Sequence, residues 1–143
     1  MPNVHKQTYV PYSAKQMYDL VNNITDYPKF LPWCKHARIL SQSATEIVAT
    51  LMLAKGGIHK SFTTKNTLTA NQEIHIGLVD GPFKKLEGHW RFIESSDGNT
   101  LVSVDLSFEF SSKLLAALLG GVFNEVANTL VSAFTQEAHR RYG

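Results

Sequence analysis

Hydrophobic and polar side chains alternate most regularly within residues 102–111. The apolar positions of this segment are Val102, Val104, Leu106, Phe108 and Phe110, and serine or carboxylate side chains fall between them. Successive residues of a strand point to opposite faces, so the pattern predicts a strand with one buried and one solvated face. Segments 74–78 and 86–92 show the same alternation. Together they predict an antiparallel sheet whose apolar face needs a cover.

The predicted cover is a long helix over Lys113–Tyr142. Its apolar residues recur at three- and four-residue steps: Leu115, Leu118, Leu119, Val122, Phe123, Val126, Leu130, Val131 and Phe134. Such a stripe is wide enough to pack on a sheet, and at about 1.5 Å per residue the helix spans roughly 40 Å. Gly120-Gly121 interrupts the stripe at about 1 kcal/mol per glycine. A kink, a close approach of a ligand or strand, and a plain irregularity are equally open interpretations.

The N-terminal part of the chain predicts one strand followed by two short helices. Asn3–Val10 reads as a strand that Pro11 ends. Ser13 and Gln16 are spaced as a capping box, which predicts a helix start at this point. A second short helix is predicted over Asp26–Leu31, because Pro32 prevents its extension.

Between the short helices and the long helix, turn signals divide the chain into consecutive strands. They fall at 41–45, 56–57, 70–72, 80–82 and 96–99. The spacing suits hairpin connections and leaves no room for helical crossovers. Mid-strand Gly77 and Gly88 are expected where the sheet bends. The sequence therefore predicts an α+β fold, a curved seven-stranded antiparallel sheet around one long helix, in a single domain over residues 1–143.

Composition supports an ordinary globular domain. Of the 143 residues, 43% are hydrophobic and 18% charged, values typical of a chain that builds its own core. Cys34 is the single cysteine, so an intrachain disulfide is excluded and a reducing compartment fits. The first residues lack the apolar run of a signal peptide, and no window holds 18 consecutive apolar residues. We therefore expect a cytoplasmic protein without a membrane span.

Charge is spread unevenly along the chain. The net charge is only +2, but nine basic residues face four acidic ones between Lys29 and Arg91. Two interpretations stay open for this surplus. The charged side chains either form a solvated sheet face or meet RNA or an anionic membrane surface.

Motifs for catalysis or metal binding are absent from the sequence. The six histidines are scattered without the spacing of a metal site, and Cys34 lacks a second cysteine at C-x-x-C spacing. Asp105 and Glu109 fall on the polar register of their strand, which is a poor position for a carboxylate pair in a cavity. We predict surface histidines, a buried inert thiol, no catalytic residue and no metal site.

The inward register of the predicted sheet supplies a large apolar volume that faces the helix. Thr64 and Asn66 share the register of Phe62, and a buried hydroxyl or amide needs a partner. A ligand oxygen and neighbouring backbone are both possible partners, just as the aromatic side chains either fill the core or line a tunnel. The predicted tunnel residues are Phe62, Thr64, Asn66, Ile76, Leu78, Trp90, Phe92, Phe108, Phe110, Leu119, Val122, Phe123, Val126 and Leu130.

Entrances to such a tunnel are expected near the Asp80–Phe83 turn and the Tyr27–Cys34 segment. If exposed, their apolar side chains would dip into a membrane interface to collect a lipid. The candidates for this contact are Phe30, Leu31, Trp33 and Phe83.

Four stretches resemble one known family in order and spacing. Tyr27–Cys34 resembles the "YPxFLPWC" motif of the START-like coenzyme Q-binding proteins, and Ser61–Asn66 resembles their "FTTxN". Gly81–Phe92 resembles "GPFxxLxGxWxF", and Phe108–Ser111 with Ala133-Phe134 and Tyr142-Gly143 resembles the closing pattern. The resemblance implies the helix-grip fold of the polyketide cyclase and lipid transport superfamily. The chain departs from the closing pattern at Glu137, where the family usually has a basic residue; Arg140 and Arg141 follow about one turn later.

The resemblance implies two functions of different class. The eukaryotic branch is a mitochondrial carrier of polyprenyl quinone, which implies a non-enzymatic carrier or chaperone for ubiquinone or a similar ligand in respiratory electron transport, without a catalytic cofactor. The bacterial branch, which the missing targeting segment favours, resembles a ribosome-association toxin that binds the large ribosomal subunit and blocks subunit joining. In that alternative, the candidate RNA contacts are Lys60, Lys65, Lys84 and Lys85.

Overall fold

A computed structural model describes residues 3–55 and 57–143 and confirms the α+β architecture. Its elements are β1 (Asn3–Val10), α1 (Ala14–Asn22), the 3-10 turn η1 (Ile24–Asp26), α2 (Tyr27–Phe30), β2 (Cys34–Gln42), β3 (Glu46–Lys55), β4 (Ile58–Thr69), β5 (Glu73–Asp80), β6 (Phe83–Glu94), β7 (Thr100–Phe110) and α3 (Lys113–Tyr142). The seven strands form one antiparallel sheet in the order β1-β7-β6-β5-β4-β3-β2.

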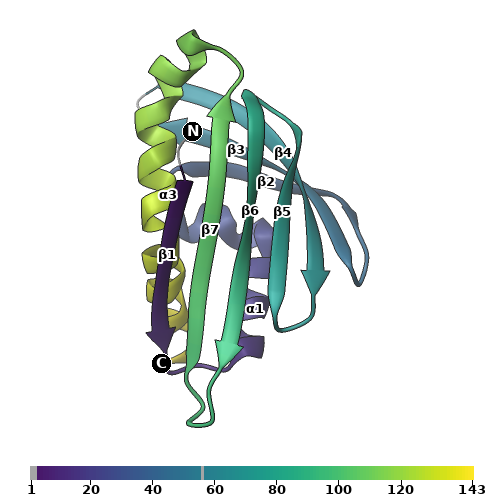
Figure 1. The fold of residues 1–143 in the computed structure, drawn as a ribbon, viewed down its shortest axis with the longest axis vertical. Helices are drawn as coiled ribbons and strands as arrows, with labels where there is room; N and C mark the ends of the chain where they lie inside the picture. Colours follow the sequence, from purple (N-terminus) through teal and green to yellow (C-terminus); the bar gives the residue numbers. More distant parts are fainter. Residues whose placement is uncertain (1–2, 56) are drawn as a thin grey trace.

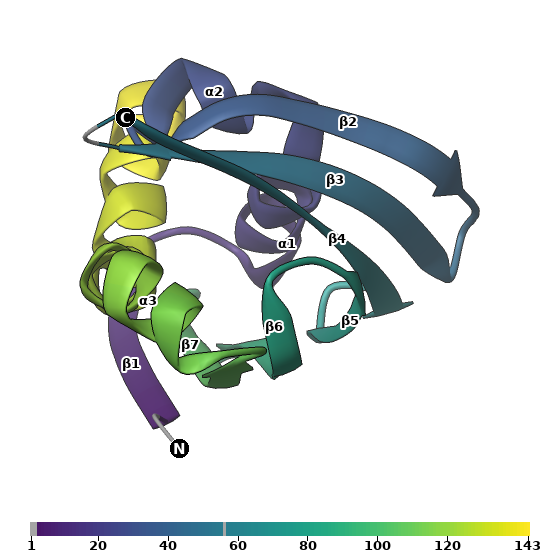
Figure 2. The ribbon, with the colours of Figure 1, turned by 90° about the horizontal axis from the view of Figure 1, so that it is seen from above.

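The sheet curves around α3. Strands β1, β7 and β6 stand beside the long helix in Figure 1. Seen from above, the sheet then turns through β5 to β4, β3 and β2, so that α1 and α3 lie on its concave side (Figure 2). Apolar side chains of alternating strand positions point to this side, which places the core between sheet and helices.

The predicted helix start at Ser13 is confirmed. Ser13 Oγ accepts a hydrogen bond from Gln16 N at 3.1 Å, and Gln16 Oε1 accepts one from Ser13 N at 2.9 Å. The second helix is shorter than predicted, because η1 precedes it and Leu31 already has extended backbone (φ −101°, ψ 106°). Pro32 accounts for this early end, since proline disfavours helical backbone in the residue before it.

The sheet bends where β5 meets β6. These strands pair only over Glu73–Gly77 and Glu87–Arg91, so the rest of β5 follows β4 away from β6. Gly88 lies at this bend against the backbone of β7, where an added Cβ atom would lie 2.2 Å from Asp105 O. A Cβ atom at Gly77 would meet nothing closer than 3.8 Å. The bend therefore needs a glycine at 88 and only permits one at 77.

Helix α3 is continuous through Gly120-Gly121 and buries one face against the sheet. Leu119, Phe123, Val126 and Phe134 are buried as the stripe predicts. Leu118 is an exception to the predicted stripe, since 51% of its surface is exposed. In the N-terminal half of α3, apolar residues occur on two sides of the helix, and only one side meets the sheet.

Candidate ligand-binding site

A small cavity of about 80 Å³ lies between α3 and the concave face of the sheet. Eight predicted tunnel residues line it: Phe62, Thr64, Asn66, Ile76, Trp90, Phe123, Val126 and Leu130. The remaining lining comes from Ile24, Tyr27, Trp33, Ala49, Leu51, Leu86, Leu106 and Phe134. The lining is mostly apolar; besides the indole N–H groups of Trp33 and Trp90, its described polar side chains are Thr64, Asn66 and Tyr27.

Thr64 and Asn66 form the polar part of the cavity. They lie on the inner face of β4, 7% and 8% exposed, and Thr64 Oγ1 donates a hydrogen bond to Asn66 Oδ1 at 3.2 Å. In the part of the chain that the structure describes, this is the one side-chain hydrogen bond of Asn66, so its Nδ2 donors lack a protein acceptor. The predicted alternative, a bond from Asn66 to neighbouring backbone, is therefore not what the structure shows. The Tyr27 hydroxyl, in contrast, is engaged, since it donates to Val21 O.

The sequence reasoning missed several cavity residues for identifiable reasons. Ala49 and Leu51 lie at alternate positions of β3, so the period-two pattern of that strand places them on the inner face. Leu86 shares the inward register of Trp90. Tyr27 and Phe134 lie in family-like motifs but come from different ends of the chain. Their rings meet at 5.3 Å between centroids, a contact that only the fold creates.

Six predicted tunnel residues do not line the cavity. Phe92 lies beyond Trp90, where its ring meets Tyr18 at 6.0 Å. Phe108 and Phe110 pack on Phe123, which lines the cavity, but they do not line it themselves. With Phe62, Phe83 and Phe123 they form an aromatic cluster whose rings pack at centroid distances from 4.7 to 6.3 Å. The other residues outside the lining are Leu78, Leu119 and Val122.

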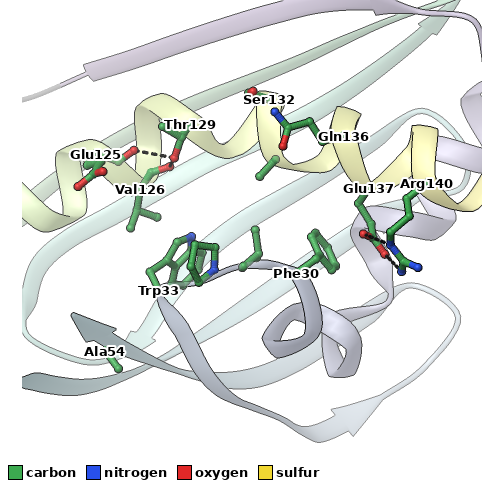
Figure 3. Close-up of a pocket in the computed structure, with 13 residues that line it drawn as sticks. Phe30, Trp33, Ala54, Glu125, Val126, Thr129, Ser132, Gln136, Glu137 and Arg140 are labelled. Carbon is green, nitrogen blue, oxygen red and sulfur yellow. Dashed lines mark hydrogen bonds and ion pairs between the residues drawn. The ribbon is translucent and has the colours of Figure 1, made fainter. Parts of the chain in front are cut away.

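A surface groove of about 760 Å³ runs along α3 next to the cavity (Figure 3). Phe30 and Trp33 lie on one side of it, and the α3 side chains Thr129, Ser132 and Gln136 lie on the other. Trp33 and Val126 line both the groove and the cavity. These two side chains therefore separate the outer groove from the inner space, at the segment where an entrance was predicted.

The predicted membrane contacts need correction. Leu31, Trp33 and Phe83 are buried, at 1%, 9% and 6% exposure, and Phe30 is half-buried. Leu31 lies in the core cluster, Trp33 packs between groove and cavity, and Phe83 stacks on Phe110 at 5.0 Å. Apolar side chains that the fold already covers are not available to a bilayer.

Glu137 holds the C-terminal end of α3 through an ion-pair network in which its own carboxylate is buried. Its carboxylate is 4% exposed and accepts hydrogen bonds from the guanidinium groups of Arg140 and Arg141. Arg141 also reaches Asp26 Oδ2 at 3.0 Å, which ties α3 to the η1 turn. The hydrogen bonds from Arg140 and then Arg141 lower the pKa of Glu137 to about 2. Glu137, which stands where the family usually has a basic residue, thus places a carboxylate that binds both Arg140 and Arg141.

The four candidate RNA contacts are exposed but differ in their pairing. Lys65 pairs with Glu46 at 3.3 Å and Lys84 with Glu109 at 3.5 Å. Lys60 and Lys85 have no carboxylate within 4.0 Å among residues 3–55 and 57–143. These two lysines are therefore the candidates with unneutralised charge.

Two titratable groups outside the cavity, Cys34 and His5, have raised pKa values. Burial raises the pKa of the Cys34 thiol to about 11, so it stays protonated and unreactive near neutral pH. His5 Nδ1 lies 2.5 Å from Asp105 Oδ1 on the solvated sheet face, and this bond raises the pKa of His5. Within the described residues, no three His, Cys, Asp or Glu side chains are grouped to hold a metal ion.

Comparisons with known proteins agree with this geometry. The Escherichia coli K12 protein named ribosome association toxin RatA is 46% identical over 142 residues, covering 99% of this chain and 90% of that protein. The Xenopus laevis protein named coenzyme Q-binding protein COQ10 homolog B, mitochondrial, is 30% identical over 136 residues, covering 92% and 56%. A solved START superfamily protein from Mycobacterium smegmatis superposes with a TM-score of 0.80 at 22% identity, covering 96% and 97%.

The family model described as polyketide cyclase / dehydrase and lipid transport matches residues 10–135, which include strands β2 to β7, the short helices and most of α3. All residues that line the inner cavity lie within the matched part. This protein belongs to the polyketide cyclase / dehydrase and lipid transport family.

Proposed function

We propose that this protein is a non-enzymatic carrier or chaperone for a hydrophobic ligand with carbonyl oxygens, a polyprenyl quinone such as ubiquinone, in respiratory electron transport. The observation that carries the proposal is the Asn66 amide, whose Nδ2 donors line an apolar cavity without a protein acceptor in the described structure. A ligand that fills the cavity without accepting a hydrogen bond would leave this donor without a partner, at a cost of about 1–3 kcal/mol. A quinone carbonyl or methoxy oxygen would accept the hydrogen bond and avoid this cost.

The size of the cavity sets a condition for binding. About 80 Å³ is less than the cavity of about 150 Å³ that holds benzene in an engineered protein. A quinone ring therefore enters only if side chains move, and Trp33 and Val126 stand between the cavity and the groove of about 760 Å³. We propose that the ring passes these two side chains and that the isoprenoid tail lies in the groove.

The cavity lining argues against catalysis in this space. General acid–base catalysis needs a titratable group within hydrogen-bond reach of the substrate. The lining holds no His, Lys, Asp, Glu or Cys, and burial keeps the Tyr27 hydroxyl protonated by raising its pKa. The quinone is thus proposed as cargo, which agrees with the name of the coenzyme Q-binding relative.

The double variant Thr64→Val/Asn66→Leu tests the carrier function. It removes both members of the polar pair and keeps similar volumes, a replacement that is nearly neutral or stabilising for the fold. We expect at least about tenfold less quinone to co-purify with it from a quinone-producing bacterium, by mass spectrometry of the solvent extract, with an unchanged or higher Tm.

The matched control is Thr50→Val/Thr63→Val. Thr50 and Thr63 also form a hydrogen-bonded pair, at 2.7 Å between their Oγ1 atoms, but on neighbouring strands at outward-facing positions. We expect this control to retain wild-type ligand content. Equal quinone content in wild type and Thr64→Val/Asn66→Leu would refute the role of the polar pair.

A second function, binding to the large ribosomal subunit that blocks subunit association, is favoured by one specific observation. The 46% identity to the protein named ribosome association toxin extends over 99% of this chain. Exposed Lys60 and Lys85, which lack carboxylate partners in the described structure, are the side chains that we propose for contacts with rRNA phosphates. Both functions fit a bacterial cytoplasmic protein with peripheral access to the inner membrane.

Charge reversal tests the ribosomal function. Because lysine–phosphate contacts release counterions, we expect Lys60→Glu/Lys85→Glu to weaken co-sedimentation with large subunits and to lower the salt slope by about 1 per lysine. Lys6→Glu/Lys15→Glu changes the net charge equally elsewhere and serves as control. Subunit binding that is equal in the two variants would contradict the assignment.

A further inference from the structure

The N-terminal half of α3 carries an apolar surface that the fold leaves uncovered. Leu114 is 69% exposed and Leu118 is 51% exposed. Residues four apart lie on the same side of a helix, so these leucines form one ridge. Exposed Ala117 and Gly121 continue it. Isolated exposed leucines are ordinary, whereas a ridge of adjacent apolar residues marks an interaction surface.

A groove of about 740 Å³ lies at the start of α3. Phe108 and Phe110 line it together with three charged side chains, Lys84, Glu109 and Lys113. Lys84 pairs with Glu109, while exposed Lys113 has no carboxylate partner in the described part of the chain. Exposed Lys85, the neighbour of Lys84 in the sequence, has none there either. Two lysines without carboxylate partners therefore lie near the groove.

The leucine ridge lies at one end of the molecule, at the start of α3 (Figure 1). The start of α3, the end of β7 and the β5–β6 turn meet at one end of the molecule, and the β6–β7 turn and the C-terminus lie at the other end (Figure 1). Behind this end, the aromatic cluster of Phe62, Phe83, Phe108, Phe110 and Phe123 packs between the helix and the sheet. Two rings of the cluster, Phe62 and Phe123, border the inner cavity.

We infer that this end of the molecule docks onto an anionic phospholipid bilayer, with Leu114 and Leu118 among the acyl chains and the unpaired Lys85 and Lys113 at the lipid phosphates. Exposed leucines bordered by lysines are the pattern of segments that lie in a membrane interface. The inference rests on the proposed carrier function, because a carrier of a membrane-dissolved ligand must reach the bilayer. The membrane contact inferred here lies at the start of α3. The sequence predicts it at Phe83 and the Phe30–Trp33 segment, where the side chains are largely buried.

Vesicle co-sedimentation of the whole protein tests the inference. We expect binding to phosphatidylcholine vesicles that contain phosphatidylglycerol, and at least about fivefold weaker binding to pure phosphatidylcholine or at high salt. Leu114→Gln/Leu118→Gln should lower the partition coefficient at least about tenfold. The control Leu40→Gln/Ile93→Gln removes two apolar side chains of similar exposure, 49% and 58%, from other elements and should bind as wild type.

The same variants separate this inference from the proposed function. Thr64→Val/Asn66→Leu should lose quinone but keep vesicle binding, so a failed carrier function leaves the docking result readable. Absence of wild-type binding to anionic vesicles, or equal binding by Leu114→Gln/Leu118→Gln and wild type, would overturn the inference. The inference would also be overturned if Leu114→Gln/Leu118→Gln kept vesicle binding but lost large-subunit binding or dimerisation. The leucine ridge would then contact the ribosome or a second copy of the chain.

Discussion

Replacing Gly88 with alanine is expected to lower the free energy of unfolding by about 3 kcal/mol or more. The new Cβ atom would lie 2.2 Å from Asp105 O and 2.6 Å from Leu106 Cδ2. The first contact is with the backbone of β7, which cannot move aside without breaking its pairing with β6. Gly88 is opposite Leu106 in that pairing, near the middle of the two longest neighbouring strands. The strain therefore falls on the part of the sheet that supports the cavity.

Gly77→Ala is the matched control for this exchange. It lies on the adjacent strand, and its Cβ atom would meet nothing closer than 3.8 Å, so we expect a change of less than about 1 kcal/mol. Urea denaturation of both variants measures the difference, and a gap of about 10 °C in Tm should accompany it. Equal stability of the two variants would contradict this prediction. It would show that the backbone of β7 at Asp105 can move away from the new Cβ atom at little cost.

Glu137→Gln is expected to lower the free energy of unfolding by about 2 kcal/mol at pH 7, because it removes the charge that joins Arg140 and Arg141. This loss is smaller than a pKa of about 2 against an ordinary 4.5 implies, because Arg140, the partner with the largest influence, is 67% exposed and solvent screens its charge. Urea denaturation at pH 7 measures the loss.

The pH dependence of this effect has a defined sign. The pKa of Glu137 is lower in the folded state than in the unfolded chain, so its stabilisation is complete above about pH 4.5 and is lost as the pH falls towards 2. The stability difference between wild type and Glu137→Gln should shrink over this window. Glu87→Gln, at an exposed position, should show little difference at any pH. A constant difference between pH 7 and pH 3 would contradict the assigned ion pairs.

The two ends of α3 are held very differently, and this bears on ligand entry. Glu137, Arg141 and Asp26 tie the C-terminal end to the η1 turn, and Phe134 packs on Tyr27 and Phe30. The N-terminal end exposes Leu114 and Leu118 and lies over a groove. A helix anchored at one end can move at the other. Access to the inner cavity is therefore expected to depend on the N-terminal half of α3 and on Trp33.

The sequence by itself determined the elements and the orientation of their side chains. Period-two alternation in 102–111 and three- and four-residue steps in 113–142 reflect the geometry of strands and helices, so both elements were predicted correctly. The same alternation placed Thr64 and Asn66 on the inner face with Phe62. The capping box at Ser13 likewise depends on neighbours within four residues. Each of these features is set by local geometry and needs no knowledge of distant segments.

Only the tertiary structure decided which inward side chains enclose the cavity and which apolar side chains stay exposed. Phe92 and Asn66 both point inward, yet one packs against Tyr18 and the other lines the cavity. Leu118 belongs to the same sequence stripe as Leu119 but faces solvent. Tyr27 meets Phe134 across more than a hundred residues. Burial depends on how segments distant in sequence meet, and the curvature of the sheet at Gly88 sets that arrangement.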